Sequence, residues 1–306
     1  MTNFTQNNHL VYTVGDVAYG YRQSSIDKFL VRVGAVDPEH YAKSNFESEL
    51  RRTADSIYQE FGKEFVVFLS GGTDSEIVVR NFLSIGVKPR CVTIKFKDGY
   101  NEDDVASAEK IALELGLDLE IIDFDVIDFF DSGQALSFGH ELQCTQITYI
   151  MVYYNIMKLS TPAVMGGELL LTRNVTKDTS YWYYTFRENE DASAMRFTNK
   201  YNIPLVNEYF SYTPELMLYY LEHPSIVSLV NDKYNYKLSS VSSKNAILKS
   251  LCPYVTEKKK SHGFESLLAF NHTAYKDIGV DQIKRLEPSL DGIAYDDVIK
   301  QLRASQ

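Results

Sequence analysis

The sequence is poor in cysteine and lacks long apolar runs. Its three cysteines, Cys91, Cys144 and Cys252, include no CxxC pair, so neither a disulfide framework nor a cysteine-rich metal site is indicated. No apolar run is long enough to cross a bilayer, and the first ten residues, MTNFTQNNHL, contain no basic patch followed by an apolar stretch. We therefore expect a cytoplasmic protein with no membrane partner.

Basic residues are also in the minority. The chain has 31 Lys and Arg against 41 Asp and Glu, which gives a net charge of −10 at pH 7. A broad nucleic-acid footprint needs a basic surface, so this balance argues against a nucleic-acid partner. Lys244, Lys249 and the run Lys258, Lys259 and Lys260 form a local exception. With 44% apolar and 24% charged residues, the composition is that of a folded globular protein.

The middle of the chain alternates between helical and strand patterns. Apolar residues at helical spacing predict helices over residues 44–61, 75–85, 102–115 and 140–158. Short apolar runs predict buried strands over residues 64–69, 91–96, 118–124 and 163–165. This alternation predicts an α/β protein with a doubly wound parallel sheet. Two alternating runs within residues 9–34 predict an N-terminal β-hairpin, which would cover a sheet edge or build an interface such as a homodimer contact.

The stretch FLSGGTDSE follows the first predicted strand. In open parallel sheets, ligands bind at the carboxyl ends of the strands, and this corner lies there. Gly71 and Gly72 would let a ligand approach the backbone closely, while the N-terminus of the following helix attracts anions. Ser70 and Ser75 add hydroxyl donors. The corner is therefore a candidate phosphate cradle, with an ordinary glycine turn and a helix-capping serine as the alternative.

Asp74 is out of place in a phosphate cradle because a carboxylate repels phosphate. A divalent cation between the two would remove this conflict, so the sequence predicts magnesium. The common phosphate-binding patterns do not match, since the chain has neither G-x-x-x-x-G-K-[ST] nor G-x-G-x-x-G after a strand.

The pattern S-G-G-x-D-S after a buried strand resembles the pyrophosphate loop (PP-loop) of the N-type ATP pyrophosphatases. The stretches NEDDVASAEKIALELGLDLEIIDF and TPAVMGGELL make the synthetase domain of asparagine synthetase-like enzymes the most similar branch. The resemblance implies an adenine nucleotide α-hydrolase-like fold in which the loop holds the phosphates while ATP is cleaved to AMP and pyrophosphate. By resemblance, this role falls to Ser70, Gly71, Gly72, Thr73, Asp74 and Ser75.

The same resemblance suggests a division of the chain. Residues 1–43 would be an N-terminal extension, 44–175 the ATP-binding α/β domain, and 176–306 a mainly helical substrate or lid region. The second strand, Val92 to Phe96, would supply backbone contacts to adenine, with Thr93 and Ile94 nearest the base. Gly166, Gly167 and Glu168 stand where the family has a Gly-Glu-Gly-x-Asp-Glu loop, so Glu168 would inherit a metal-binding role or be a simple turn residue.

The basic run near residue 259 resembles a late lysine-containing segment of these synthetases. One of Lys258, Lys259 and Lys260 would then stabilise charge on the leaving pyrophosphate, whereas the alternative is a solvated surface patch. The tyrosine-rich residues 171–240 match no motif, and such aromatic density is typical of a core or an interface.

The resemblance favours an adenylating ligase that uses ATP and Mg²⁺ to activate a carboxylate or carbonyl of a small-molecule acceptor for attack by nitrogen. Glutaminase-containing relatives carry a cysteine after the initiator methionine, but residue 2 here is Thr2. Ammonia or an amine would therefore come from outside. Two alternatives stay open: an enzyme that modifies a nucleobase or tRNA, and a nucleotide-binding module without catalysis.

Overall fold

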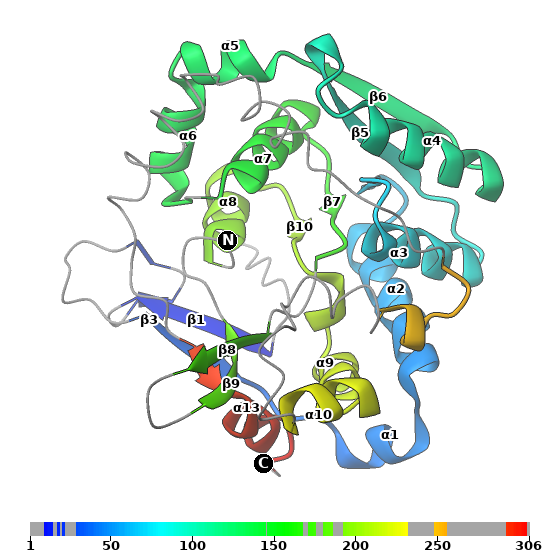
Figure 1. The fold of residues 1–306 in the computed structure, drawn as a ribbon, viewed down its shortest axis with the longest axis vertical. Coiled ribbons are helices and arrows are strands. Elements are labelled where there is room, and N and C mark those ends of the chain that lie inside the picture. The colour runs from blue at the N-terminus through cyan, green and yellow to red at the C-terminus, as the bar shows by residue number, and fades with distance from the viewer. Residues whose placement is uncertain are drawn as a thin grey trace.

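The computed structural model is an α/β fold built around a parallel sheet (Figure 1). The structure describes residues 9–14, 17–18, 20–21, 29–144, 146–167, 171–175, 180–185, 192–231, 248–255 and 292–304. Within these ranges, no helix has the length and apolar character needed to span a membrane.

The parallel sheet has five strands and confirms the predicted fold class. They are β4 (Val66–Phe68), β5 (Arg90–Phe96), β6 (Leu119–Phe124), β7 (Ala163–Val164) and β10 (Leu205–Val206), in the spatial order β10-β7-β4-β5-β6. After β4, the chain adds β5 and β6 on one side of β4 and then β7 and β10 on the other side. The strand order therefore reverses between β4 and β7, which is where open α/β sheets bind ligands.

Helices cover both faces of this sheet. The helices of the described part of the chain are α1 (Pro38–Lys43), α2 (Phe46–Phe61), α3 (Thr73–Ser84), α4 (Glu102–Leu115), α5 (Val126–Asp131), α6 (Gln134–Leu142), α7 (Ile147–Leu159), α8 (Ser193–Tyr201), α9 (Pro214–Leu221), α10 (Pro224–Asn231) and α13 (Tyr295–Leu302). The predicted helices at 44–61, 75–85 and 102–115 match α2, α3 and α4. The single helix predicted over 140–158 is wrong, because α6 ends at Gln143, a left-handed residue with φ +48°, and α7 begins at Ile147.

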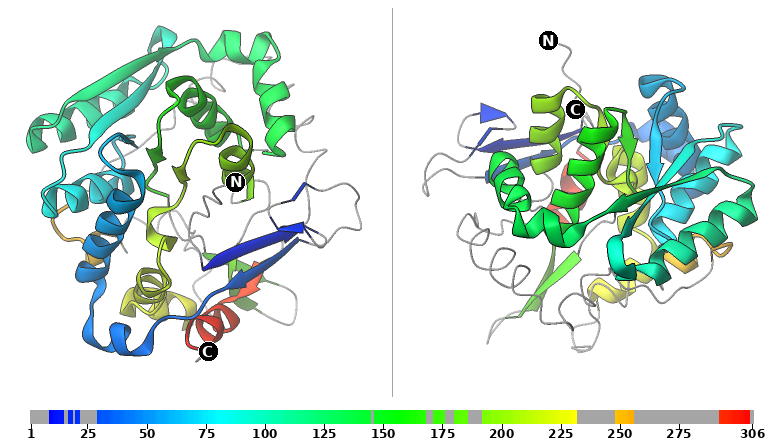
Figure 2. Two further views of the ribbon diagram at one scale, coloured as in Figure 1. Left: turned by 180° about the vertical axis from the view of Figure 1, so that it is seen from behind. Right: turned by 90° about the horizontal axis from the view of Figure 1, so that it is seen from above.

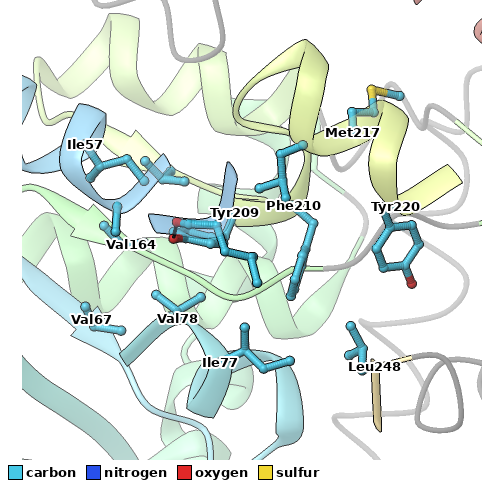
Figure 3. Close-up of a cluster of buried hydrophobic side chains, with 14 of the residues drawn as sticks. Ile57, Val67, Ile77, Val78, Val164, Tyr209, Phe210, Met217, Tyr220 and Leu248 are labelled. Carbon is cyan, nitrogen blue, oxygen red and sulfur yellow. Dashed lines mark hydrogen bonds between the residues drawn. The ribbon is translucent and has the colours of Figure 1, made fainter. Parts of the chain in front are cut away.

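The sheet separates two apolar cores. Successive residues of a strand point to opposite faces, so Val67 joins one core and Phe68 the other. Figure 3 shows part of the first core, in which α2, α3, β4, β7 and α9 meet; its labelled members are Ile57, Val67, Ile77, Val78, Val164, Tyr209, Phe210, Met217, Tyr220 and Leu248. The second core lies under α5, α6, α7 and α8. With both faces packed, the loops at the carboxyl ends of the strands are the natural place for a site.

Two small antiparallel sheets flank the main one. Strands β1 (Leu10–Val14), β2 (Val17–Ala18) and β3 (Phe29–Val33) confirm the predicted N-terminal hairpin. Both views of Figure 2 place β1 and β3 on the opposite side of the molecule from β5 and β6, so the hairpin does not cover the β6 edge. Strands β8 (Leu171–Val175), β9 (Ser180–Thr185) and β11 (Gly292–Ala294) form the other sheet.

The proposed domain boundary at residue 175 stays a prediction. The structure pairs β8 with β9 across this position and places β10 in the parallel sheet. The C-terminal half therefore contributes strands to two sheets as well as helices.

A partly buried ionic network joins the first helices to α9. The Glu49 carboxylate, 1% exposed, lies 2.7 Å from both His40 Nε2 and Arg52 Nε. Arg52 also donates a hydrogen bond from Nη2 to Glu215 Oε2. The other carboxylate oxygen of Glu215 accepts a 3.0 Å hydrogen bond from the Asp37 amide. Since Asp37 caps α1 and Glu215 lies in the first turn of α9, one network fixes three helices.

We expect Glu49→Ala to lower the free energy of unfolding by about 2 kcal/mol, because it leaves His40 and Arg52 without their buried partner; Arg52 is 37% exposed, which moderates the loss. Urea unfolding measures this change. The matched control is Glu39→Ala, whose exposed pair with Lys43 spans 4.0 Å and should contribute less than about 0.5 kcal/mol. Equal effects of the two substitutions would contradict the structural role assigned to Glu49.

Candidate active site

Three loops meet at the point where the strand order reverses. They follow β4, β7 and β10 and contain Ser70–Gly72, Met165–Gly167 and Asn207–Glu208. The Tyr209 amide donates a 2.8 Å hydrogen bond to the Gly166 carbonyl, which joins the second loop to the third. The three loops therefore form one continuous surface at the carboxyl edge of the sheet.

Two glycines make the approach of these loops possible. A Cβ on Gly166 would lie 2.9 Å from the Ser75 amide nitrogen and 3.1 Å from Asp74 Cβ. Gly167 has φ +61°, and a Cβ there would lie 2.6 Å from Glu208 Cα. The loop after β7 is thus packed between the first turn of α3 and the loop after β10, with no room for a side chain on either glycine.

Gly71 is required for a second kind of contact. Its φ is +72°, and an added Cβ would lie 2.6 Å from the Asp104 carbonyl oxygen and 2.7 Å from Ser107 Cβ. Both neighbours belong to α4, whose first turns therefore press on the loop. The sequence suggested that this glycine admits a ligand, whereas the structure shows that it admits a neighbouring helix.

The start of α3 has the features of an anion-binding site. Gly72 is its N-cap and, as a glycine, makes no side-chain capping hydrogen bond to the first turn. The first backbone bond of the helix runs from the Glu76 amide to the Gly72 carbonyl, at 3.1 Å. The amides before it lie outside the intrahelical bonds, and the helix dipole adds partial positive charge there. These amides fit a phosphate group.

Two serine hydroxyls stiffen this corner. Ser75 Oγ donates to the Gly72 carbonyl at 2.9 Å and lies 3.3 Å from Ser70 Oγ. Thr73 and Ser75 are buried, while Ser70 is half-buried. The predicted loop residues therefore come together in one compact turn.

The first turn of α3 carries two carboxylates in different settings. Glu76 is 1% exposed and accepts hydrogen bonds from Arg80 Nη2 at 2.6 Å and Nε at 2.9 Å. Its charge is thereby compensated within the helix. Asp74 is half-buried and lies beside Gly166, so it is the carboxylate suited to hold a divalent cation that also binds phosphate oxygens.

The described part of the chain contains no group of three or more His, Cys, Asp or Glu residues that could hold a metal ion by themselves. Mg²⁺ is commonly bound through one or two carboxylates together with substrate phosphates and water. Asp74 fits that kind of site. Glu168, the other predicted ligand, and Lys258, Lys259 and Lys260 lie outside the described residues.

The predicted adenine contacts lie in β5. Thr93 and Ile94 are 5% and 7% exposed, and Ile94 points into the second apolar core. The predicted contact is through the backbone of the strand. Their contact with adenine stays a prediction.

Asn101 was not foreseen as a residue of this region. Its Nδ2 donates to the Ile94 carbonyl at 2.8 Å, and its Oδ1 accepts from the Phe96 amide at 2.7 Å. Asn101 also begins α4, since its carbonyl accepts from the Asp104 and Val105 amides at 3.1 Å. It therefore ties the end of β5 to the helix that packs on Gly71.

Sequence reasoning also missed Asn207 and its partner. Asn207 is 5% exposed, and its Oδ1 accepts a 2.7 Å hydrogen bond from the buried Tyr153 hydroxyl. The available signal was a short apolar run, residues 203–206, followed at once by Asn207 and Glu208. Both polar residues lie at the carboxyl edge because β10 is parallel to β7.

Comparison with known proteins finds no matching family model and no matching curated sequence. Solved structures that match include an NH3-dependent NAD synthetase from Campylobacter jejuni, with 14% identity and a TM-score of 0.30 over 42% of this chain and 57% of that chain. An NMN synthetase from Francisella tularensis matches with 14% identity and a TM-score of 0.29 over 80% of this chain and 96% of that one.

A predicted subunit of tRNA methyltransferase from Methanocaldococcus jannaschii matches with 19% identity and a TM-score of 0.31, over 64% of this chain and 93% of that chain. The present chain spans only 57% of the NAD synthetase.

We expect Gly71→Ala to lower the free energy of unfolding by about 3 kcal/mol, because it combines an unfavourable positive φ with a collision against the α4 backbone. Gly116→Ala is the matched control: Gly116 is also left-handed, with φ +63°, but has nothing within 4 Å of its Cβ position. It should cost about 1 kcal/mol. Urea unfolding compares the two, and equal costs would show that the α4 contact is relaxed in solution.

Proposed function

We propose that this chain is an ATP-dependent adenylating ligase of the asparagine synthetase-like type, which cleaves ATP to AMP and pyrophosphate. One observation carries the proposal. The uncapped start of α3, with Asp74 in its first turn and Gly166 packed against it, lies at the strand-order reversal of a doubly wound sheet. Oriented amides, a half-buried carboxylate and a tight loop are the parts needed to bind Mg²⁺ and a polyphosphate.

The residues of the chain would act by positioning and by charge stabilisation. The segment Ser70–Ser75 would bind the β and γ phosphates, and Asp74, with Glu168 as a second ligand, would hold Mg²⁺, which would neutralise phosphate charge. An oxygen of the acceptor's carboxylate or carbonyl then attacks the α-phosphorus, and the bond to pyrophosphate breaks. Ammonia or an amine from outside displaces AMP and forms the carbon–nitrogen bond. Such a reaction depends on orientation and fixed dipoles more than on acid–base chemistry.

The position of residues 248–255 supports a role for the lysines that follow. Val255 is 4% exposed in the first core, and the Tyr254 ring lies 5.9 Å from the Arg80 guanidinium on α3. The start of α3 is about 10 Å from Arg80 along the helix, at roughly 1.5 Å per residue. An extended chain from Val255 reaches about 10 Å by Lys258 and about 17 Å by Lys260. The length of chain between Val255 and Lys260 is therefore sufficient to span the distance from Arg80 to the start of α3.

The cysteines argue against a thiolation reaction. All three are buried, and burial raises the pKa of the Cys91 thiol to about 12. Cys144 donates to the Gln146 carbonyl at 3.7 Å and is 0% exposed. Sulfur transfer needs an accessible thiolate. We therefore favour carbon–nitrogen bond formation over a tRNA-thiolating activity.

The first functional prediction concerns the bond that is cleaved. With α-labelled ATP, Mg²⁺, ammonium and a mixture of cell metabolites, we expect labelled AMP and no labelled ADP on thin-layer chromatography. Asp74→Asn should lower turnover by about a hundredfold or more by removing the cation's carboxylate. The control is Asp118→Asn, a change at a fully exposed carboxylate 99% accessible to solvent, which should leave turnover unchanged. Labelled ADP would overturn the proposal, and no turnover by any variant would favour a binding module.

The second prediction concerns the lysine run. Individual alanine substitutions of Lys258, Lys259 and Lys260 should produce one large loss, of about a hundredfold in kcat, and two small ones. ATP affinity should change less than kcat, because the ammonium acts mainly as charge moves onto pyrophosphate. Lys249→Ala, at an exposed position of the neighbouring helical turn, is the control. If all three variants keep normal turnover with unchanged circular dichroism, the charge partner lies elsewhere, with Arg173 and Lys244 as the next residues to test.

A further inference from the structure

Asn207 presents one unused hydrogen-bonding group at the carboxyl edge of the sheet. The Tyr153 hydroxyl donates to its Oδ1 at 2.7 Å, which orients the side-chain amide. The remaining group, Nδ2, carries two N–H donors. No described residue accepts a hydrogen bond from Nδ2, although the side chain is only 5% exposed. Nδ2 is not one of the buried side-chain atoms without a partner in the described part of the chain, so this donor is accessible to water or to a ligand.

This amide is close to the phosphate cradle. The Asn207 carbonyl lies 2.7 Å from the Cβ position of Gly167, and Gly166 in turn packs on Asp74 and Ser75. Only β7 separates β10 from β4, so Asn207 is displaced from the cradle by about 10 Å along the sheet edge, at roughly 4.8 Å per strand. Asn207 therefore lies beside the cradle, at the same edge of the sheet.

An aromatic ring lies on the same side. Tyr149 is one helical turn before Tyr153, and their rings stack with centroids 5.8 Å apart and 5° between their planes. Because α7 leads into β7, it runs against the strand direction, and its earlier residues lie nearer the carboxyl edge. Tyr149 is half-buried there, while Tyr153 is fully buried. The pair therefore offers a rigid wall beside Asn207.

We propose that Asn207 binds the acceptor substrate by donating its Nδ2 hydrogens to a carboxylate or carbonyl oxygen, with Tyr153 as a positioning residue. The assignment rests on the proposed adenylating function and deepens it. With Oδ1 already engaged by Tyr153, the group that Asn207 presents is a donor, so the matching ligand atom is an acceptor. A carboxylate satisfies this donor and supplies the nucleophilic oxygen at the same time.

The test uses exchange of labelled pyrophosphate into ATP, which reports adenylation of a carboxylate. The probes are the twenty common amino acids and a set of aliphatic and aromatic monocarboxylates, first pooled and then separate. Asn207→Asp replaces the donor with a negative charge and keeps an oxygen for Tyr153. We expect it to raise the KM of the active carboxylate on the order of a hundredfold, while the Kd of Mg·ATP by calorimetry changes less than about twofold.

Tyr153→Phe is the second variant and covers the case in which Asn207→Asp does not fold. It removes the hydroxyl and keeps the ring, so we expect the KM to rise about tenfold with little change in kcat. The control is Asn202→Asp, at an exposed asparagine on the connection that leads into β10, which should leave both constants unchanged.

Each outcome decides the matter. A rise in the carboxylate KM with unchanged Mg·ATP affinity supports the assignment. Unchanged KM values in both variants overturn it and leave the proposed function intact. Parallel losses of carboxylate and Mg·ATP binding also overturn it, since Asn207 would then only shape the sheet edge. If wild-type protein binds Mg·ATP but no carboxylate supports exchange, carboxylate activation itself fails, and the role of Asn207 with it.

Discussion

The site depends on close backbone contacts that only glycine permits. Gly71 lets the first turns of α4 rest on the loop after β4, and Gly166 lets the loop after β7 rest on the first turn of α3. Gly167 allows the loop after β10 to approach from the other side. A methyl group at any of these positions would meet backbone or Cβ atoms at 2.6–2.9 Å. Because these three positions carry no side chain, the three loops can pack closely against their neighbours.

These contacts also determine the electrostatics of the corner. Packing against α4 and the loop after β7 holds the start of α3 with its first amides directed out of the sheet edge, where their partial positive charge attracts an anion. Arg80, one turn further along α3, neutralises the buried Glu76. Asp74 is thereby distinguished from its neighbour, although both are acidic residues in the same turn of helix.

Much of this arrangement could be predicted from local sequence. Apolar runs predicted the strands around residues 66–68, 90–96 and 119–124. Apolar periodicity predicted the helices between them, because each of these helices packs one face against the sheet. The division between α6 and α7 was missed because Gln143, unlike glycine, carries no local signal for its left-handed conformation. Asn101 and Asn207 were missed for a different reason: their partners, Ile94, Phe96 and Tyr153, are identified only by folding.

The sequence by itself therefore determined the α/β class, the position of the glycine-rich corner and the acidic residue within it, because periodicity and turn chemistry act over a few neighbouring residues. The tertiary structure decided which loops share that corner and which polar groups face one another. It alone showed that Gly71 accommodates α4 and that Asn207, more than 130 residues after the loop, belongs to the same sheet edge. Such contacts depend on the strand order β10-β7-β4-β5-β6, which brings distant segments together and which the residues around each segment do not determine.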